Sequence, residues 1–232
     1  LACDNVVYGD RLKGISLELH KGEILGIGGL AHCGMHSLGK VLFGALSPQS
    51  GTVTVTDGEK KTVVKNEAVA MKHAMGYVSK DRDTESLALS ASIKDNIAIA
   101  GMGKYAVGKF IILDPLEKKY VDEQIESLSI KCSDRNQTVT TLSGGNKQKV
   151  VFGKWVGCGS EILILDCPTR GVDIGVKQAM YQLMVKLKQE GKAILLISEE
   201  MPELMGMSDR ILIMKDGEIK KEFLRSKDLS DA

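Results

Sequence analysis

The sequence is poor in aromatic residues and carries almost no net charge. Aromatic side chains make up 4% of its 232 residues, and 31 Lys and Arg are balanced by 30 Asp and Glu, which gives a formal net charge of +1. Opposite charges are interspersed along the chain. Because nucleic-acid binding depends on a basic surface, no nucleic-acid partner is expected.

The chain also lacks long hydrophobic runs and paired cysteines. No apolar stretch approaches the ~20 residues that a helix needs to span a bilayer, and no signal peptide precedes the first predicted strand. The start at Leu1 favours a piece of a longer protein. The odd number of cysteines and the absence of a CxxC pair argue against a disulfide framework or a zinc site, and favour a reducing compartment. The cysteines are Cys3, Cys33, Cys132, Cys158 and Cys167.

The main pattern that is present is an alternation of apolar strands with helices. The predicted elements are strands at 15–19, 24–27, 50–56, 76–79, 161–166 and 193–198, helices at 37–43, 66–73 and 177–190, and hairpin turns at Asp57-Gly58 and Asp216-Gly217. Asn66 is expected to cap its helix. This order predicts an α/β fold with a mainly parallel sheet covered on both faces and an N-terminal antiparallel part.

The middle of the chain has a helical pattern instead. We interpret about 90–156 as an inserted helical subdomain, which leaves about 1–89 and 157–232 as the α/β core. Asp114 is expected to cap a helix that has Pro115 as its first residue.

The segment GLAHCGMHS has the spacing of a phosphate-binding loop between a strand and a helix. Gly29 and Gly34 are separated by four residues, as in GxxxxGK[ST], but Met35 stands in the place of the lysine and His36 in the place of Ser or Thr. The glycines favour a backbone cradle for phosphate, and loss of the lysine charge is expected to weaken binding about ten- to hundredfold. Ser37 can supply the hydroxyl only if the loop slips by one residue.

A second candidate phosphate site is the segment TLSGGNKQKVVFG. Ser143, Gly144 and Gly145 open a predicted helix, whose free N–H groups and dipole favour phosphate. Taken alone, the pattern is more often that of a capping loop.

Four segments together resemble the ABC-type ATPases, in the form typical of sugar importers. LSGGNKQKV resembles the signature motif, ILILDCPTRGVDIG the Walker B and D-loop segment, LLISEEMPELMGMSDRILIMKDGEI the switch region, and KGEILGIGGLAHCGMHSLGKVLFGALSPQSGTV the Walker A region. They occur in the family order and cover nearly the whole chain. The resemblance is to the second, C-terminal ATPase half of ribose-, galactose- and xylose-type subunits, and it implies a P-loop NTPase (RecA-like) core.

The resemblance also identifies departures from the family pattern. Asp166 takes the place of the acidic residue near Mg²⁺. Cys167 stands in the place of the glutamate that polarises the attacking water, a role worth roughly 10²–10⁴-fold, and Glu199 in the place of the switch histidine. The glutamine ligand aligns with Lys80 or with Ser79, and Lys80 is either a source of the missing positive charge or a surface lysine. We treat the altered positions as four independent losses.

An intact signature beside an altered site predicts a half-site whose own chemistry is dispensable. ABC ATPase halves pair head to tail, with each nucleotide between the Walker A of one and the signature of the other. The resemblance therefore implies that Ser143, Gly144, Gly145 and Asn146 complete a partner's ATP site. Asp173, in the D-loop, would cross the same interface, and it is also expected to cap the following helix.

As a whole, the resemblance implies a nucleotide-binding half of an ATP-driven importer of sugars or related small solutes, peripheral on the cytoplasmic face of the membrane, with ATP or ADP and Mg²⁺ weakly bound. Implied partners are an N-terminal half or another ATPase subunit, transmembrane permease subunits and, indirectly, a periplasmic or extracellular solute-binding protein. Residues 79–96, including Arg82, Asp83 and Glu85, are either the permease contact or a solvated loop.

Two alternatives remain open at this stage. One is an active ATPase with a rearranged site, in which Lys80 or Ser37 substitutes for lost groups. The other is an interaction or regulatory domain that binds no nucleotide.

Overall fold

The computed structural model describes residues 1–107 and 111–225, which divide into two compact units. The first unit comprises 1–77, 161–167 and the described residues from 180 onward, and the second comprises 78–160 and 168–179. The helical segment expected at about 90–156 lies within the second unit, whose limits are wider.

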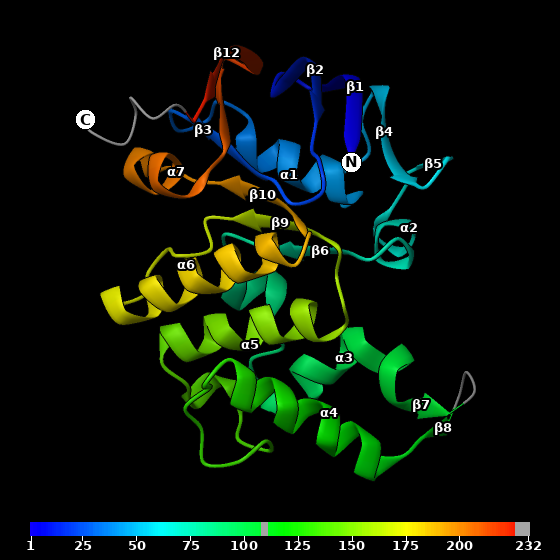
Figure 1. Cartoon of the computed structure of the whole chain (residues 1–232), viewed down its shortest axis with the longest axis vertical. Helices are drawn as coiled ribbons and strands as arrows, with labels where there is room; N and C mark the ends of the chain where they lie inside the picture. The colour runs from blue at the N-terminus through cyan, green and yellow to red at the C-terminus, as the bar shows by residue number, and fades with distance from the viewer. Residues whose placement is uncertain (108–110, 226–232) are drawn as a thin grey trace. The chain divides into compact units, whose positions relative to one another are not determined.

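The first unit contains two sheets (Figure 1). An antiparallel sheet has the order β2-β1-β4-β5, and a six-stranded sheet has the order β12-β11-β3-β10-β9-β6. In the larger sheet β3 runs parallel to β10 and β11, β10 runs parallel to β9, and β12 is antiparallel to β11. The strands are β1 (Ala2–Tyr8), β2 (Leu12–Glu18), β3 (Ile24–Gly29), β4 (Ser50–Asp57), β5 (Lys60–Val63), β6 (Met75–Val78), β9 (Ile162–Asp166), β10 (Ala193–Ile197), β11 (Arg210–Lys215) and β12 (Glu218–Leu224). The α/β fold with an N-terminal antiparallel part is confirmed.

Helices α1 (Met35–Phe43) and α7 (Met201–Met207) cover opposite faces of the larger sheet. Side chains alternate between the two faces along a strand, so Gly26 and Gly28 of β3 share one face. A Cβ on Gly26 would lie 2.3 Å from Ser208 Oγ, which directly follows α7, and one on Gly28 would lie 2.5 Å from Leu204 Cδ1 of α7. On the other face, Gly39 of α1 packs against β10 and β9.

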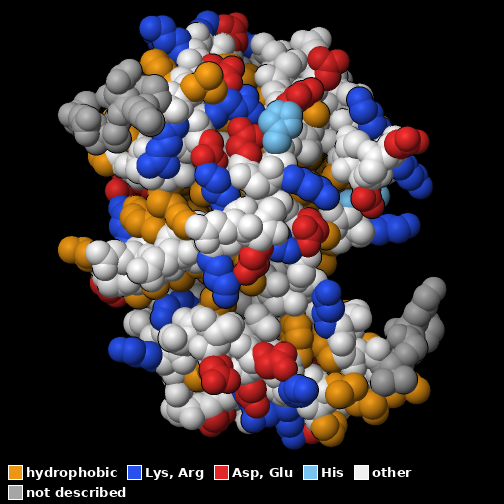
Figure 2. All heavy atoms as spheres, viewed as in Figure 1, with side chains coloured by type: hydrophobic (Ala, Val, Ile, Leu, Met, Phe, Trp, Pro, Cys, Tyr) orange, Lys and Arg blue, Asp and Glu red, His pale blue; other side chains and the backbone are white. Residues whose placement is uncertain are grey.

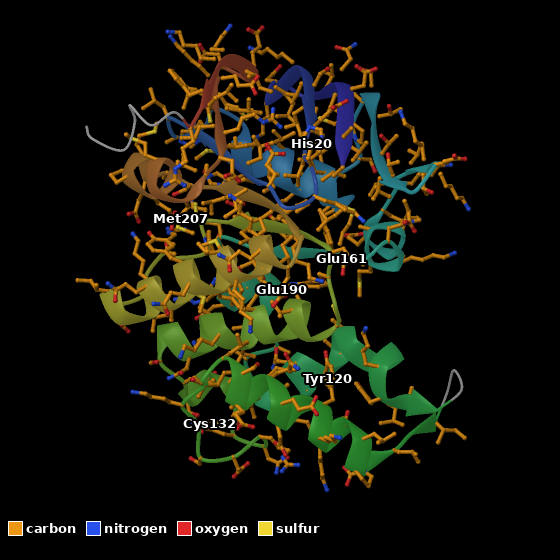
Figure 3. All side chains as sticks on the ribbon, viewed as in Figure 1. His20, Tyr120, Cys132, Glu161, Glu190 and Met207 are labelled. Carbon is orange, nitrogen blue, oxygen red and sulfur yellow. The ribbon has the colours of Figure 1, made fainter. Side chains whose placement is uncertain are left out.

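The second unit is built around three packed helices, α3, α4 and α5 (Figure 1). The elements in or entering this unit are η1 (Arg82–Ser86, a π-helical turn), α3 (Ile93–Tyr105), β7 (Ala106–Val107), β8 (Ile111–Ile112), α4 (Asp114–Ser127), η2 (Val139–Thr141), α5 (Gly144–Gly157) and the first turns of α6 (Ile174–Gln189). Tyr120 of α4, labelled in Figure 3, packs its ring 5.3 Å from that of Tyr105 on α3.

Two helix caps and two hairpins test the local predictions. Asn66 caps α2 (Glu67–Lys72) through the Val69 N–H at 3.0 Å, as predicted. The predicted cap at Asp114 is wrong. Leu113 is the cap residue, and the Asp114 carboxylate instead pairs with Lys118 one turn further on.

The hairpin at Asp216-Gly217 is confirmed, because Lys215 pairs with Glu218 across those two residues. The first hairpin is displaced by one residue. Asp57 pairs with Lys60, so Gly58 and Glu59 form the turn, which places glycine at its first position.

Surface charge, cysteine pairing and the character of the helices bear on the expectations drawn from composition. Figure 2 shows basic and acidic side chains intermixed on the face that it draws. None of the five cysteines, all of which lie in the described residues, forms a disulfide. Among residues 1–107 and 111–225, the structure has no helix with both the length and the apolar character that a membrane span requires.

Candidate functional site

The candidate site of the first unit lies where three neighbouring strands end. Since β3, β10 and β9 are adjacent and parallel, their carboxyl ends meet at one edge, where α/β sheets bind ligands. The loop from Leu30 follows β3, Asp166 ends β9, and Glu199 lies two residues beyond the end of β10. Glu161, labelled in Figure 3, immediately precedes β9 at the opposite edge.

The loop after β3 has a backbone that only glycine permits at its last position. Gly34 has φ of 101°, and a Cβ there would lie 2.1 Å from the carbonyl oxygen of Arg11. A Cβ on Gly29 would lie 2.4 Å from the carbonyl oxygen of Met214. Helix α1 begins at Met35, directly after Gly34, so the loop presents a helix N-terminus of the kind that favours phosphate.

The side chain in the lysine position faces the interior. Met35 is 1% exposed and belongs to the core of the first unit. Ser37 lies in the first turn of α1 and is also buried. The loop therefore keeps its backbone shape while its position 35 side chain has become part of the packing.

The His36 side chain contacts two other residues that the family resemblance identified, Asp166 and Glu199. Its Nδ1 lies 2.7 Å from Asp166 Oδ1, and its Nε2 lies 3.3 Å from Glu199 Oε1. One imidazole therefore connects the loop, the end of β9 and the segment after β10.

Asp166 and Cys167 complete the cluster. Asp166 is 1% exposed and accepts a hydrogen bond from the Tyr77 hydroxyl at its Oδ2, 3.1 Å away. Cys167 is buried, and its N–H donates to the Ile197 carbonyl at 2.8 Å. The ligand atoms of His36, Asp166 and Cys167 all lie within 4.8 Å of one another.

These donors do not match the Mg²⁺ set that the family resemblance implies. Mg²⁺ prefers octahedral oxygen ligands, but around Asp166 the cluster offers an imidazole nitrogen and a thiol. Sequence reasoning missed Tyr77, for which the signal was a hydroxyl in the otherwise apolar, buried strand Met75–Val78.

The signature segment lies in the second unit and caps α5. Ser143 Oγ accepts from the Asn146 N–H at 3.4 Å and from the Asn146 side-chain amide at 3.1 Å. Asn146 Oδ1 in turn accepts from the Lys131 N–H at 2.9 Å. The capping loop that the sequence allowed is present, and Asn146 is oriented by it.

Both signature glycines are closely packed within the second unit. A Cβ on Gly144 would lie 2.9 Å from an Arg82 guanidinium nitrogen, and one on Gly145 would lie 2.6 Å from Val176 Cγ2. Arg82 donates to the Arg170 carbonyl at 2.8 Å. The turn η1 and the first turn of α6 therefore pack against the start of α5.

The remaining predicted residues also belong to the second unit. Lys80 follows Ser79, whose hydroxyl hydrogen-bonds the Glu85 carboxylate. Asp83 pairs with Lys147 at 2.9 Å, and residues 82–86 form a π-helical turn in which Asp83 and Glu85 are exposed. Asp173 accepts from the Val176 N–H at 3.0 Å, as expected of a cap.

Solved structures show the class of fold. The chain superposes on an ATP-binding cassette, MJ0796, described as a dimeric post-hydrolysis state bound to ADP and Pi, with a TM-score of 0.81 over 97% of this chain and 98% of that one at 20% identity. A nucleotide-free ATP-binding cassette from an ABC transporter gives a TM-score of 0.79 over 99% and 93%, also at 20% identity. The fold is that of the ATP-binding cassette, a P-loop NTPase fold.

The family follows from the sequence comparisons. The ABC transporter family model matches residues 12–170. Similar curated proteins are the ribose import ATP-binding protein RbsA of Clostridium tetani, 40% identical over 97% of this chain and 44% of that protein, and RbsA of Bacillus subtilis, 40% identical over 90% and 42%. The chain belongs to the ABC transporter family, and it spans less than half the length of these relatives.

Proposed function

We propose that the chain is a nucleotide-binding half of an ATP-driven importer of sugars or related small solutes, in which its own site hydrolyses ATP weakly or not at all. Its signature residues Ser143, Gly144, Gly145 and Asn146 complete the ATP site of a second half or subunit. Permease subunits and, through them, a solute-binding protein are the remaining partners, and the chain lies on the cytoplasmic face of the membrane.

One observation carries the silent-site part of this proposal. The His36 ring occupies the Ser/Thr position and holds Asp166 and Glu199 through its two nitrogens, at 2.7 and 3.3 Å. Two carboxylates close to a phosphate-binding loop repel phosphate, and the buried Met35 supplies no opposing charge. The resemblance to ribose import proteins supports the sugar class.

The proposed experiment begins with the chain alone. ATP and ADP are titrated calorimetrically with and without Mg²⁺, and phosphate release is then measured. We expect weak binding without turnover. Turnover that Asp166→Asn abolishes would contradict the silent site and favour the rearranged ATPase, and the absence of binding at millimolar nucleotide would favour the interaction domain.

The role in trans is tested in an assembly with a partner half that has an intact site. Ser143→Arg places a large cation where the partner's nucleotide would meet the signature, and we expect hydrolysis to fall by roughly 10²-fold or more. The matched control is Ser127→Arg at the exposed C-terminal end of α4. Equal activity of the two variants would exclude the trans role.

A further inference from the structure

We infer that the cluster at the strand ends of the first unit is a Zn²⁺ site, with His36, Asp166 and Cys167 as its protein ligands. Among residues 1–107 and 111–225, this is the one group of three His, Cys, Asp or Glu side chains whose ligand atoms converge. The site does not depend on the proposed transport function, because it is measured on the chain alone and without nucleotide.

The donor set selects the metal. One imidazole nitrogen, one carboxylate oxygen and one thiolate suit a borderline ion such as Zn²⁺, whereas Mg²⁺ and Ca²⁺ need oxygen ligands. Zn²⁺ bound to N, O and S at about 2.0–2.3 Å separates its tetrahedral ligand atoms by about 3.2–3.8 Å. To reach this geometry, His36 Nδ1 and Asp166 Oδ1, now 2.7 Å apart, must separate, and any separation near the 4.8 Å limit must close, by about 1 Å in each case.

The hydrogen bonds around the ligands match the surroundings of bound zinc. A metal-ligating histidine usually donates its second ring N–H to a carboxylate, which fixes its tautomer. Here Nδ1 is on the Asp166 side, and Nε2 lies 3.3 Å from Glu199. The Tyr77 hydroxyl donates to Oδ2 of Asp166, which leaves Oδ1 toward the metal.

Access and protonation are also suited to an ion. The His36 side chain is 27% exposed while Asp166 is 1% exposed, so the site is open on the histidine side and closed behind. Only neutral imidazole and thiolate are ligands, so metal binding strengthens as pH rises. Three protein ligands leave a fourth tetrahedral position for water or a phosphate oxygen.

Cysteine spacing had argued against a zinc site. That argument concerns paired cysteines close in sequence, whereas these ligands come from a helix start and a strand end 130 residues apart. Only the order of the parallel strands brings them together.

Co²⁺ is the probe of choice, because thiolate coordination to Co²⁺ produces a near-ultraviolet charge-transfer band. We expect the chain to bind one Co²⁺ with such a band, Zn²⁺ to displace it, and millimolar Mg²⁺ to leave it unchanged. Cys167→Ser should remove the band. The control Cys33→Ser alters another buried thiol of the loop, whose pKa burial raises, and should retain it.

Two further variants separate the ligand role from folding. His36→Asn should abolish one-to-one binding, and Glu199→Gln should weaken it about 10- to 100-fold without changing the band. His20, labelled in Figure 3, precedes the opposite end of β3, and His20→Asn should change nothing. The inference is overturned if the folded chain gives no one-to-one band, if the band persists in Cys167→Ser, or if Mg²⁺ displaces Co²⁺ as readily as Zn²⁺ does.

Discussion

The phosphate loop and the signature segment differ in which of their residues the fold requires. In the loop, contact with the Arg11 carbonyl requires glycine at Gly34, while Met35 is buried and His36 contacts two carboxylates. In the signature segment, Ser143 caps α5 and Gly145 packs on Val176. In the loop, the backbone requirement falls on Gly34 and the polar contacts of the site on His36. In the signature segment, the residues proposed to meet nucleotide are also those that cap and pack α5.

This difference affects how an intact motif is interpreted. Packing alone accounts for Gly145, since any side chain there meets Val176. A glycine variant of the signature therefore measures stability as much as nucleotide binding, and Ser143→Arg, which removes the α5 cap, is interpreted together with its own free energy of unfolding.

The largest expected effect comes from restoring the altered side chains together. The fourfold variant Met35→Lys, His36→Ser, Cys167→Glu and Glu199→His should raise hydrolysis at this site about 10²–10⁴-fold, because a lysine charge and a general base return. Phosphate release is measured beside a partner half whose own site is inactivated. Since residues of one cluster act as a unit, Cys167→Glu alone should gain little, and an equal gain would show that the positions act separately.

A second test concerns the loop backbone. Gly34→Ala should lower the free energy of unfolding by about 2–4 kcal/mol, because φ of 101° is unfavourable for alanine and its Cβ meets the Arg11 carbonyl oxygen. Gly58→Ala is the matched control, with φ of 60° and no atom within 4 Å of the new Cβ. It should cost about 1 kcal/mol. Urea titrations measure the free energy of unfolding of both variants. Equal losses would show that the close approach of Gly34 to the Arg11 carbonyl does not affect stability.

The signature helix offers a pH-dependent test. Burial lowers the pKa of Lys154 in α5 to about 8, and Cys158 partly opposes the shift. Between this value and the unfolded value of 10.5, the unfolded state binds more protons, so the free energy of unfolding rises with pH in that window and the cost of the buried charge is greatest below pH 8.

Lys154→Met removes that cost and keeps an unbranched side chain. At pH 7 the variant should be more stable than the wild type by about 1–3 kcal/mol, after allowance for the lost bond to the Ser86 carbonyl. The advantage should shrink between pH 8 and pH 10 in urea titrations. A constant difference across that range would show that Lys154 keeps its charge.

The smallest effects compare two helical glycines of the second unit. Gly145→Ala should destabilise by about 1–2 kcal/mol, because its Cβ would lie 2.6 Å from Val176. Gly103→Ala in α3 has no atom within 4 Å of the new Cβ and should stabilise by about 0.5–1 kcal/mol. Thermal unfolding of both variants gives the comparison, and the same sign for both would contradict the packing argument.

Periodicity and turn chemistry predicted most elements of the first unit. The apolar runs became β3, β9 and β10, and Asn66 and Asp173 cap their helices. Asp114 is instead the first residue of α4, and its carboxylate pairs with Lys118. A rule that considers one position does not anticipate a partner one turn further along the helix.

The cluster could not be predicted from spacing alone. His36, Asp166 and Glu199 are far apart in sequence, and their contacts depend on strand order and on the rotamer of one imidazole. The family resemblance assigned each of these residues to a separate motif. The chain's own pairing of His36 with two carboxylates appears only in three dimensions.

The two hydrogen bonds of His36 also have a meaning for folding. They close loops of 130 and 163 residues, and such long closures become favourable only after β3, β10 and β9 have taken their native order. A collapsed chain with helices but the wrong strand neighbours would leave the ring in water. The ring proton resonances of His36 therefore report native topology, and distinguish it from mere compactness during refolding.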